Sequence, residues 1–311
     1  MAKKVIVSEF IAEAALEAFG PAFEIRYDPA LVDDPERLRL ELAQADALIV
    51  RNRTRVDLDL LKAAPRLRVV GRLGVGLENI DLDACAEKGV VVRPATGANT
   101  QSVVEYVIGA MLVLRRGVFA SSGNVLAGDW PRGPLGRGGE VHGQVLGLVG
   151  LGAIAQAVSK AARALGMSIA AFEPYLTPTD PAWSDVRPCG LEELLALADV
   201  LSLHVPLTQS TRNLIDAAAL SKMKPGAVLI NTARGGVVDE AALAAALRTG
   251  RLAGAAVDVF TAEPLDAAAA AVFKGCPNLI LTPHIAGVTE PANARVSQVT
   301  VENVLQVLTD D

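Results

Sequence analysis

Short apolar runs alternate with longer amphipathic stretches through the first hundred residues. The runs are apolar on both faces, and about 10–15 residues of helical pattern separate them, which is typical of βαβ units in a parallel sheet. The expected strands are residues 4–8, 24–27, 47–51, 67–71 and 90–93, and the expected helices are residues 11–19, 35–43, 58–64 and 82–88. This pattern predicts an α/β domain of nearly 100 residues.

A second α/β series begins at residue 145. Its expected strands are residues 145–149, 168–172, 200–204, 228–232, 255–260 and 279–282, which is enough for a doubly wound nucleotide-binding domain. A helical pattern at 102–115 and a glycine-rich stretch at 123–143, expected to be an irregular loop, precede it, and a last helix is expected at 291–308. We therefore predict two doubly wound parallel-sheet domains with a cleft between them, which is the default place for a binding site.

Composition narrows the class of protein. Hydrophobic residues make up 51% of the chain but aromatic residues only 4%, so the cores must consist mainly of Ala, Val, Leu and Ile. The net charge of −6 disfavours general nucleic-acid binding, which needs a basic face. No apolar run reaches the ~18 residues of a spanning helix, and the start lacks a secretory pattern. Cys85, Cys189 and Cys276 are typical of reduced cysteines in a cytoplasmic protein, with neither disulfides nor a metal site.

A glycine-rich turn follows the strand expected at 145–149. Gly150, Gly152 and Ala155 form a G-x-G-x-x-A pattern that leads into a helix, where a pyrophosphate can lie on the helix N-terminus. Glu173 ends the next strand, 21 residues after Gly152 (173 − 152). A carboxylate there accepts hydrogen bonds from ribose hydroxyls and repels a 2′-phosphate, which favours NAD over NADP. The alternative is that Glu173 is a surface residue beside a turn.

Three polar residues follow three other strands of this series. Arg234, Glu263 and His284 each come at the end of an apolar run, and the carboxyl ends of parallel strands meet at one edge of the sheet. A lone histidine at such a place is more often a surface or packing residue. With the arginine and the glutamate beside it, the set instead matches hydride transfer at C2 of a 2-hydroxy acid. Histidine serves as the general acid or base, the carboxylate orients it, and the guanidinium polarises the substrate.

The chain resembles the D-isomer-specific 2-hydroxyacid dehydrogenases over almost its whole length. The segments that carry the resemblance are 71–82, 147–155, 203–215, 223–240, 255–264 and 281–287, in the family's order and spacing. The resemblance implies that Arg234, Glu263 and His284 are catalytic. It also implies that the backbone around Gly74, Val75 and Gly76 holds the substrate carboxylate. The remaining residues implied to bind NAD are Gly150, Gly152, Ala153, Ile154, Glu173, His204, Val205, Pro206, Thr208, Thr211, Thr232, Ala233, Asp258, His284 and Gly287.

The same resemblance implies the domain organisation and the assembly. Residues 1–98 with 285–311 correspond to a flavodoxin-like substrate domain, and residues 99–284 to a Rossmann NAD-binding domain. Family members are typically homodimers joined through the nucleotide domains, and the stretch around Trp130 resembles their dimer loop. Ala155 and Glu78 depart from the commoner Gly and Asp without affecting the chemistry.

The choice of substrate depends on a few arginines. Arg51, Asn52 and Arg53 follow the third expected strand, and Arg72 precedes the Gly74 loop. Arg51 matches the cation that binds phosphate in the family's phosphoglycerate dehydrogenases, although Asn52 replaces the usual Ser. The group is consistent with a second substrate anion, as in 3-phosphoglycerate or (S)-3-sulfolactate. The alternative is surface arginines and a small general pocket, as in a hydroxypyruvate or glyoxylate reductase.

Two rival functions have weaker support. A dinucleotide-sensing interaction protein, like the corepressors that share this fold, carries additional tail segments, whereas this chain ends three residues after its last expected helix. Formate dehydrogenases place Gln where Glu263 stands. We therefore expect an NAD-dependent enzyme with a small-molecule substrate and with neither a nucleic-acid nor a membrane partner.

Overall fold

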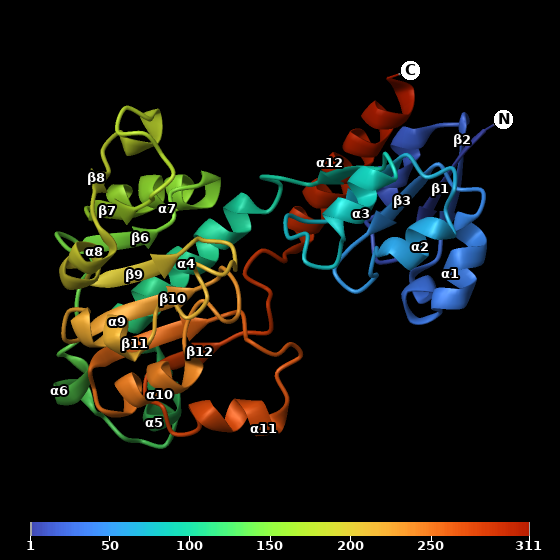
Figure 1. The fold of residues 1–311 in the computed structure, drawn as a ribbon. Coiled ribbons are helices and arrows are strands. Elements are labelled where there is room, and N and C mark those ends of the chain that lie inside the picture. The colour runs from blue at the N-terminus through green and yellow to red at the C-terminus, as the bar shows by residue number, and fades with distance from the viewer. Residues whose placement is uncertain (1, 311) are drawn as a thin grey trace. The chain divides into compact units, whose positions relative to one another are not determined.

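The computed structural model describes residues 2–310, which form two α/β units with one parallel sheet each (Figure 1). One unit contains the residues up to Asn99 and those from Val288 onward, and the other runs from Thr100 to Gly287. The chain therefore passes from one unit to the other twice, between Asn99 and Thr100 and between Gly287 and Val288. The two parallel sheets confirm the expected fold class.

The sheet of the first unit has five strands in the order β2-β1-β3-β4-β5, and every neighbouring pair is parallel. Because the strand order reverses between β1 and β3, this is a doubly wound sheet of the flavodoxin type. The strands are β1 Lys3–Val7, β2 Phe23–Tyr27, β3 Ala47–Val50, β4 Val69–Arg72 and β5 Val91–Pro94.

Helices cover both faces of this sheet. Alternate strand residues point to opposite faces, so Ile6 and Leu48 pack in one core, whereas Val5 and Ile49 pack in the other. The C-terminal helix α12 supplies Val301 and Val304 to the second core, and the chain thus returns to complete this unit. The helices are η1 Glu13–Phe19, η2 Pro29–Asp33, α1 Pro35–Leu42, α2 Leu58–Lys62, α3 Leu82–Glu87 and α12 Glu290–Thr309.

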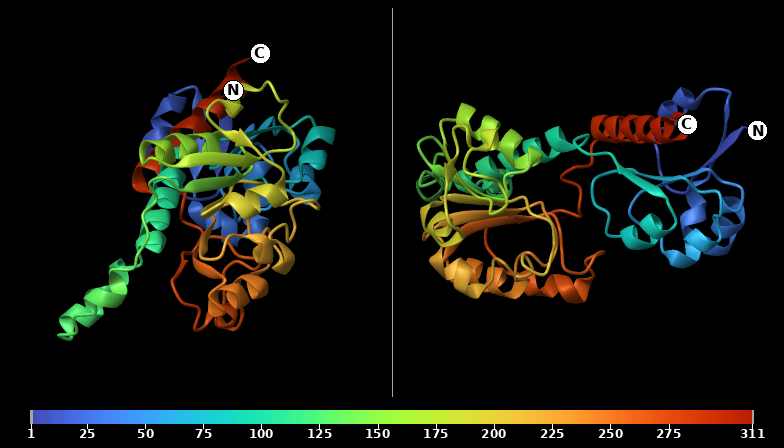
Figure 2. Two further views of the ribbon diagram at one scale, coloured as in Figure 1. Left: turned by 90° about the vertical axis from the view of Figure 1, so that its left-hand side faces the viewer. Right: turned by 45° about the horizontal axis from the view of Figure 1, so that its top comes forward.

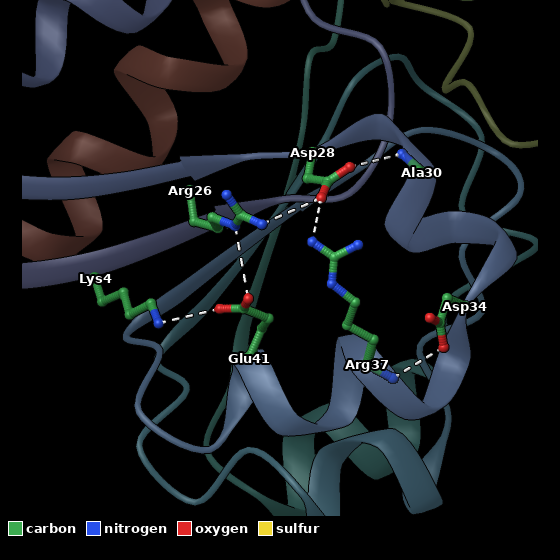
Figure 3. Close-up of polar contacts among 7 residues, drawn as sticks. All are labelled: Lys4, Arg26, Asp28, Ala30, Asp34, Arg37 and Glu41. Carbon is green, nitrogen blue, oxygen red and sulfur yellow. Dashed lines mark hydrogen bonds and ion pairs between the residues drawn. The ribbon is translucent and has the colours of Figure 1, made fainter.

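A network of charged side chains joins the edge strand β2 to its neighbours (Figure 3). The Asp28 carboxylate pairs with Arg37 at 2.6 Å and with Arg26 at 3.3 Å. Glu41 pairs with Lys4 at 3.3 Å and with Arg26 at 3.6 Å. These cations therefore have partners within β1, β2, α1 and the turn after β2, and they are not among the candidates for binding a substrate.

The sheet of the second unit has seven parallel strands in the order β12-β11-β10-β9-β6-β7-β8. The order reverses between β6 and β9, and a ligand in such a sheet binds outside the carboxyl ends at that point. The strands are β6 Val145–Val149, β7 Ser168–Phe172, β8 Arg187–Pro188, β9 Val200–Leu203, β10 Ala227–Asn231, β11 Leu252–Val257 and β12 Leu279–Leu281.

Helices cover both faces of this sheet (Figure 2), and each face has its own core. Val228 and Ile230 pack with α4 and α7, whereas Leu229 between them packs with α8, α9 and α10. The helices of this unit are α4 Thr100–Arg116, η3 Phe119–Ser121, α5 Ser122–Leu126, α6 Arg132–Leu135, α7 Ala153–Ala164, η4 Pro181–Trp183, α8 Leu191–Leu197, α9 Ala217–Lys222, α10 Glu240–Arg248, α11 Ala267–Ala270 and η5 Ala271–Phe273.

The second unit departs from the expectation in two places. Residues 123–143 are not wholly irregular, because they include α6 and most of α5, and this segment extends away from the sheet in Figure 2. A seventh strand, β8, was not expected, since its two residues are too few to give an apolar run. None of the described helices has the length and apolar character needed to cross a membrane.

Candidate functional site

The turn between β6 and α7 packs closely against the backbone that follows β9. Gly150 has φ +91°, and a Cβ there would lie 2.6 Å from the carbonyl oxygen of His204, so the tight approach of the two strand ends requires glycine. Gly152 is the N-cap of the 12-residue helix α7, and no described side chain caps this helix. Its first N–H groups and the positive end of the helix dipole therefore remain available for an anion.

Glu173 lies beside this turn because β7 pairs directly with β6. Its Oε2 accepts a hydrogen bond from the Leu151 N–H at 3.1 Å, and its Oε1 accepts one from the Tyr175 N–H at 3.1 Å. Each carboxylate oxygen retains acceptor capacity for a further donor. The carboxylate is therefore fixed next to the glycine turn, as a contact to ribose hydroxyls requires.

These features fit a dinucleotide. The uncapped helix N-terminus matches a pyrophosphate, and the neighbouring carboxylate matches a ribose diol. In addition, the Thr232 hydroxyl, directly after β10, is buried and has no hydrogen-bond partner among the described residues. A polar atom of this kind fits a ligand group at the strand ends.

His204 follows β9 and is held in its neutral form. Its Nε2 lies 2.9 Å from the Ser202 hydroxyl, and burial lowers the pKa of His204 to about 4. The loop after it is braced internally, since the Thr211 hydroxyl donates to the Pro206 carbonyl at 2.6 Å and accepts from the Thr208 N–H at 2.7 Å. His204 therefore lies at the nucleotide side of the sheet without charge at neutral pH.

Glu263 and His284 form a hydrogen-bonded pair. His284 Nδ1 lies 2.7 Å from Glu263 Oε2, and Glu263 Oε1 accepts from the Phe260 N–H at 2.9 Å. Because an ionised carboxylate only accepts, the His284 proton on this side resides on Nδ1. The other ring nitrogen, Nε2, is then left for a reacting group, and the imidazole remains about half exposed.

Arg234 belongs to a loop that packs against the loop of Glu263. The neighbouring Gly235 has no room for a side chain, because a Cβ there would clash with the carbonyl oxygen of Phe260. The buried Asn231 fixes the turn, donating to the Arg234 carbonyl at 3.2 Å and accepting from the Ala233 N–H at 3.1 Å. Backbone packing between the two loops thus links Arg234 to the Glu263–His284 pair.

Asp258 is a buried residue whose carboxylate accepts hydrogen bonds from the turn around His284. It is 1% exposed, and its Oδ1 accepts from the Thr282 hydroxyl at 2.6 Å and the Ile285 N–H at 2.8 Å. Its Oδ2 accepts from the Ala286 N–H at 2.9 Å. The carboxylate therefore stabilises the turn that carries His284, and acceptor capacity remains on Oδ2.

In the first unit, the loop after β4 presents unused donors. The N–H groups of Val75 and Gly76 have no acceptor among the described residues, and Gly74 adopts φ +137°. Arg72 donates from Nη1 to the Leu73 carbonyl at 2.7 Å, so its guanidinium lies over this loop. The loop therefore combines free amides with a cation, as carboxylate binding requires.

The Arg51 side chain is held by two neighbours. Its guanidinium donates to Asn293 Oδ1 of α12 at 3.0 Å and lies 5.8 Å from the centre of the Phe10 ring. Burial lowers the pKa of Arg51, and the charge of Glu9 opposes that shift, but arginine stays protonated. Of its neighbours, Arg53 pairs with Asp33 on the exposed surface, whereas Asn52 is exposed. Of the two arginines that follow β3, Arg51 is thus better positioned than Arg53 to bind an anion.

Sequence reasoning missed Glu9, which organises this loop. Glu9 is 5% exposed, and its Oε1 accepts from the N–H groups of Arg51 at 2.8 Å and Thr54 at 2.9 Å, while Oε2 accepts from that of Arg53 at 3.1 Å. The sequence signal that could have found it is its place two residues after the end of β1, a position like that of the other polar residues that follow strands. The other missed residues are Asn231, Tyr106, Thr282 and Asn293.

The described residues contain no group of three or more His, Cys, Asp or Glu side chains able to hold a metal ion. The three cysteines are free thiols, and Cys85 is buried. Burial and the charge of Asp81 raise the pKa of Cys85 to about 11, so this thiol is not a nucleophile at neutral pH.

Comparison with known proteins finds its relatives among dehydrogenases. Residues 108–286 match the family described as D-isomer specific 2-hydroxyacid dehydrogenase, NAD binding domain. The chain is 53% identical over 305 residues to an (S)-sulfolactate dehydrogenase of Chromohalobacter salexigens, covering 98% of both chains. It is 38% identical to a D-3-phosphoglycerate dehydrogenase of Mycobacterium leprae, covering 96% of this chain but only 56% of that protein.

The fold is likewise similar to known structures. A glyoxylate reductase from Paecilomyes thermophila superposes with a TM-score of 0.88 and 27% identity, covering 99% of this chain and 96% of that one. The likeness therefore extends over both α/β units.

Proposed function

This chain belongs to the D-isomer-specific 2-hydroxyacid dehydrogenase family, and from that premise we propose that it oxidises (S)-3-sulfolactate with NAD. The family establishes the reaction class: an NAD-dependent oxidoreductase that acts on a 2-hydroxy or 2-oxo acid. The substrate is our proposal. The observation that carries it is the likeness to the sulfolactate dehydrogenase over nearly the full length of both chains.

The proposed substrate is consistent with the positions of the cations. A sulfonate needs a guanidinium in addition to the groups that bind the carboxylate, and Arg51 is held in place by Asn293 and Phe10. The prefix S in this acid corresponds to the D arrangement, because sulfur changes the naming priority. The phosphate of 3-phosphoglycerate has similar chemistry and is the second candidate, favoured by the likeness to the phosphoglycerate dehydrogenase.

We propose that His284 transfers the proton and that Glu263 orients the imidazole of His284. During oxidation, neutral His284 accepts the C2 hydroxyl proton at Nε2, since Nδ1–H is held by Glu263. The C2 hydrogen leaves as hydride, and the alcohol becomes a 2-oxo acid. In the reverse direction, the imidazolium returns the proton to the C2 oxygen, and its charge is stabilised by the Glu263 carboxylate.

Arg234 and the loop after β4 bind and orient the acid. The planar guanidinium of Arg234 polarises the C2 oxygen and pairs with the carboxylate. The N–H groups of Val75 and Gly76, together with Arg72, provide further donors to that carboxylate. We further propose that residues 1–98 with 285–311 form the substrate-binding domain and that residues 99–284 form the NAD-binding domain, which also supplies Arg234.

The residues around β6 and β7 would hold NAD. Gly150 permits the tight turn, and Gly152, where a Cβ would meet open space, would let the backbone approach the pyrophosphate. Glu173 would bind the adenosine ribose, and Thr232 and Asp258 would contact the nicotinamide end. When bound, NAD accepts or returns the hydride. The remaining proposed contacts to NAD are Ala153, Ile154, His204, Val205, Pro206, Thr208, Thr211, Ala233, His284 and Gly287.

We further propose a cytoplasmic homodimer joined through the NAD-binding units. Four large apolar side chains on residues 117–140, which follow α4, are exposed: Phe119 by 62%, Val125 by 48%, Leu126 by 89% and Trp130 by 77%. Such a patch favours a protein partner over solvent, and a second copy of this chain offers the same patch. Free thiols are consistent with the cytoplasm.

The decisive test is substrate preference, followed as nicotinamide absorbance. The purified protein is assayed with (S)-3-sulfolactate, D-3-phosphoglycerate, D-glycerate and D-lactate, each with NAD and with NADP. We expect the highest kcat/KM with (S)-3-sulfolactate and NAD. Preference for D-glycerate with reduction of hydroxypyruvate or glyoxylate would overturn the second-anion proposal. NADH binding without turnover of any acid would instead indicate a dinucleotide-sensing protein.

A further inference from the structure

A short chain of hydrogen bonds connects α4 to Asp258. The Tyr106 hydroxyl lies 2.6 Å from Thr282 Oγ1, and Thr282 Oγ1 lies 2.6 Å from Asp258 Oδ1. The three residues come from α4, from the end of β12 and from the end of β11. All three belong to the second unit, and neither Tyr106 nor Thr282 has a part in the chemistry assigned above.

The direction of these hydrogen bonds follows from the groups themselves. The Asp258 carboxylate only accepts, so Thr282 must donate its single proton to Asp258. The Thr282 oxygen is then the acceptor for Tyr106, which must donate. Burial, together with the nearby Asp258 charge, raises the pKa of Tyr106, so the phenol keeps its proton throughout the neutral range. The order Tyr106 to Thr282 to Asp258 is therefore fixed.

The acceptor at the end of this chain stabilises a strained turn. His284 has φ +54°, a left-handed conformation that costs energy for a residue with a side chain. The His284 N–H donates to the Asp258 carbonyl at 2.8 Å, and the next two N–H groups, of Ile285 and Ala286, donate to the Asp258 carboxylate. The Asp258 carboxylate thus maintains the backbone that aims the imidazole.

The network also lies next to both passages of the chain between the units. Helix α4 begins at Thr100, directly after the first passage, and Tyr106 lies within its second turn. The His284 turn ends at Gly287, directly before the second passage. The hydrogen bonds therefore tie the start of α4 to the turn that carries His284.

We propose that Tyr106 is a positioning residue for His284, acting through Thr282 and Asp258 to keep the imidazole directed at Glu263. The inference rests on the proposed role of His284 in the reaction. Without the Tyr106 proton donor, the Thr282 hydroxyl is free to rotate away from Asp258 Oδ1. The left-handed turn then samples other conformations, and a smaller fraction of the molecules holds His284 ready to accept a proton.

The test compares four variants with the intact enzyme. Tyr106→Phe removes only the donor, Thr282→Val removes the central hydroxyl, Thr282→Ser keeps it, and Tyr27→Phe on the edge strand β2 is the control. We expect Tyr106→Phe and Thr282→Val to lower kcat by about three- to tenfold while KM for NAD stays within about twofold. Thr282→Ser and Tyr27→Phe should retain kcat.

A double-variant cycle and a spectroscopic measurement complete the test. Tyr106→Phe combined with Thr282→Val should be no slower than Thr282→Val alone, because both act through one hydrogen bond. NMR of the histidine Cε1–H signals, assigned with His142→Gln and His284→Gln, should show the His284 signal shifted in both single variants. This readout needs no turnover, so it tests the network even if the proposed substrate is wrong.

Three results would contradict the proposed role of Tyr106. Additive losses in the double variant would mean that Tyr106 does not act through Thr282. An increase in KM for the acid in Tyr106→Phe alone would mean that the phenol contacts the substrate directly. An unmoved His284 signal with unchanged kcat, accompanied only by lower thermal stability, would mean that Tyr106 serves only to stabilise the fold.

Discussion

At the scale of single residues, the proposed chemistry depends on which His284 nitrogen carries the proton. The hydrogen bond to Glu263 places the proton on Nδ1 and leaves Nε2 to react. The glutamate thus sets the tautomer and stabilises the imidazolium that forms during oxidation. The proposed recognition of a second anion likewise depends on one side chain, since the Arg51 guanidinium lies 5.8 Å from the centre of the Phe10 ring, whereas Arg53 pairs with Asp33 on the surface.

Replacing Glu263 tests the tautomer. In Glu263→Gln the imidazolium loses its carboxylate partner, so it releases its proton at lower pH. We expect the alkaline limb of the kcat/KM profile for reduction to move to lower pH, and kcat to fall by about 10- to 100-fold. Steady-state rates from pH 5 to 9 measure both. An unchanged profile would contradict the assignment of Glu263.

Replacing Arg51 tests the second anion site. Arg51→Gln should lower kcat/KM for (S)-3-sulfolactate by about 10- to 100-fold, because a charge-assisted hydrogen bond is lost, and should change the rate with D-lactate much less. Arg53→Gln is the matched comparison, and its effect should be smaller because Arg53 already pairs with Asp33. Equal losses for both acids in Arg51→Gln would show that Arg51 does not recognise the anion.

Burial of His204 predicts a pH dependence of stability. The folded protein takes up this proton only near pH 4, whereas the unfolded chain takes it up near 6.5, so the unfolded state binds more protons between these values. The free energy of unfolding should therefore decrease from pH 6.5 towards 4, by at most about 3 kcal/mol from this residue. Urea unfolding of wild type and His204→Asn measures it. The same decrease in both proteins would refute the contribution.

At the scale of elements, the three residues proposed to be catalytic, Arg234, Glu263 and His284, lie on loops that follow β10, β11 and β12. The parallel pairing of these strands brings their carboxyl ends to one edge. Strands were predictable to within one or two residues in most places, because apolar side chains face both cores. The expected strand at 255–260 was three residues too late, since β11 ends at Val257 and residues 258–260 already belong to the loop of Glu263.

Gly235 provides a test of how two of these loops fit together. In Gly235→Ala the new methyl group clashes with the Phe260 carbonyl and must displace Arg234 relative to Glu263. We expect kcat/KM to fall by about 100-fold or more, because a displacement near 1 Å is enough for such a loss. Gly190→Ala, whose Cβ meets open space, is the control and should retain activity. Full activity of Gly235→Ala would show that the contact is dispensable.

At the scale of the whole molecule, the chain builds the second unit as one continuous segment and closes the first with α12. Residues 117–140, which follow α4, supply no side chain to either core of the second unit and carry exposed apolar side chains. The interpretation of this segment as an irregular loop was incomplete because its helices are only four and five residues long. Periodicity needs a longer stretch to be detected.

The proposed dimer gives a prediction at this scale. Leu126→Asp with Trp130→Ala should convert a dimer into a monomer, since a charge placed in an apolar interface is costly. Light scattering during gel filtration measures the mass. Tyr175→Phe, a change on an exposed side chain, should leave it unaltered. A wild-type protein that is already monomeric would reject the proposal.

The sequence by itself determined the fold class, the cofactor motif and the strand-end residues, since all of these depend on local periodicity and spacing. Only the tertiary structure decided which side chains these residues form hydrogen bonds with. Glu9 bonds to Arg51 across 42 positions, Arg51 to Asn293 across 242, and Tyr106 to Thr282 across 176. Such pairs have no local pattern, because only the folding of distant strands and helices onto each other brings the two side chains within hydrogen-bond distance.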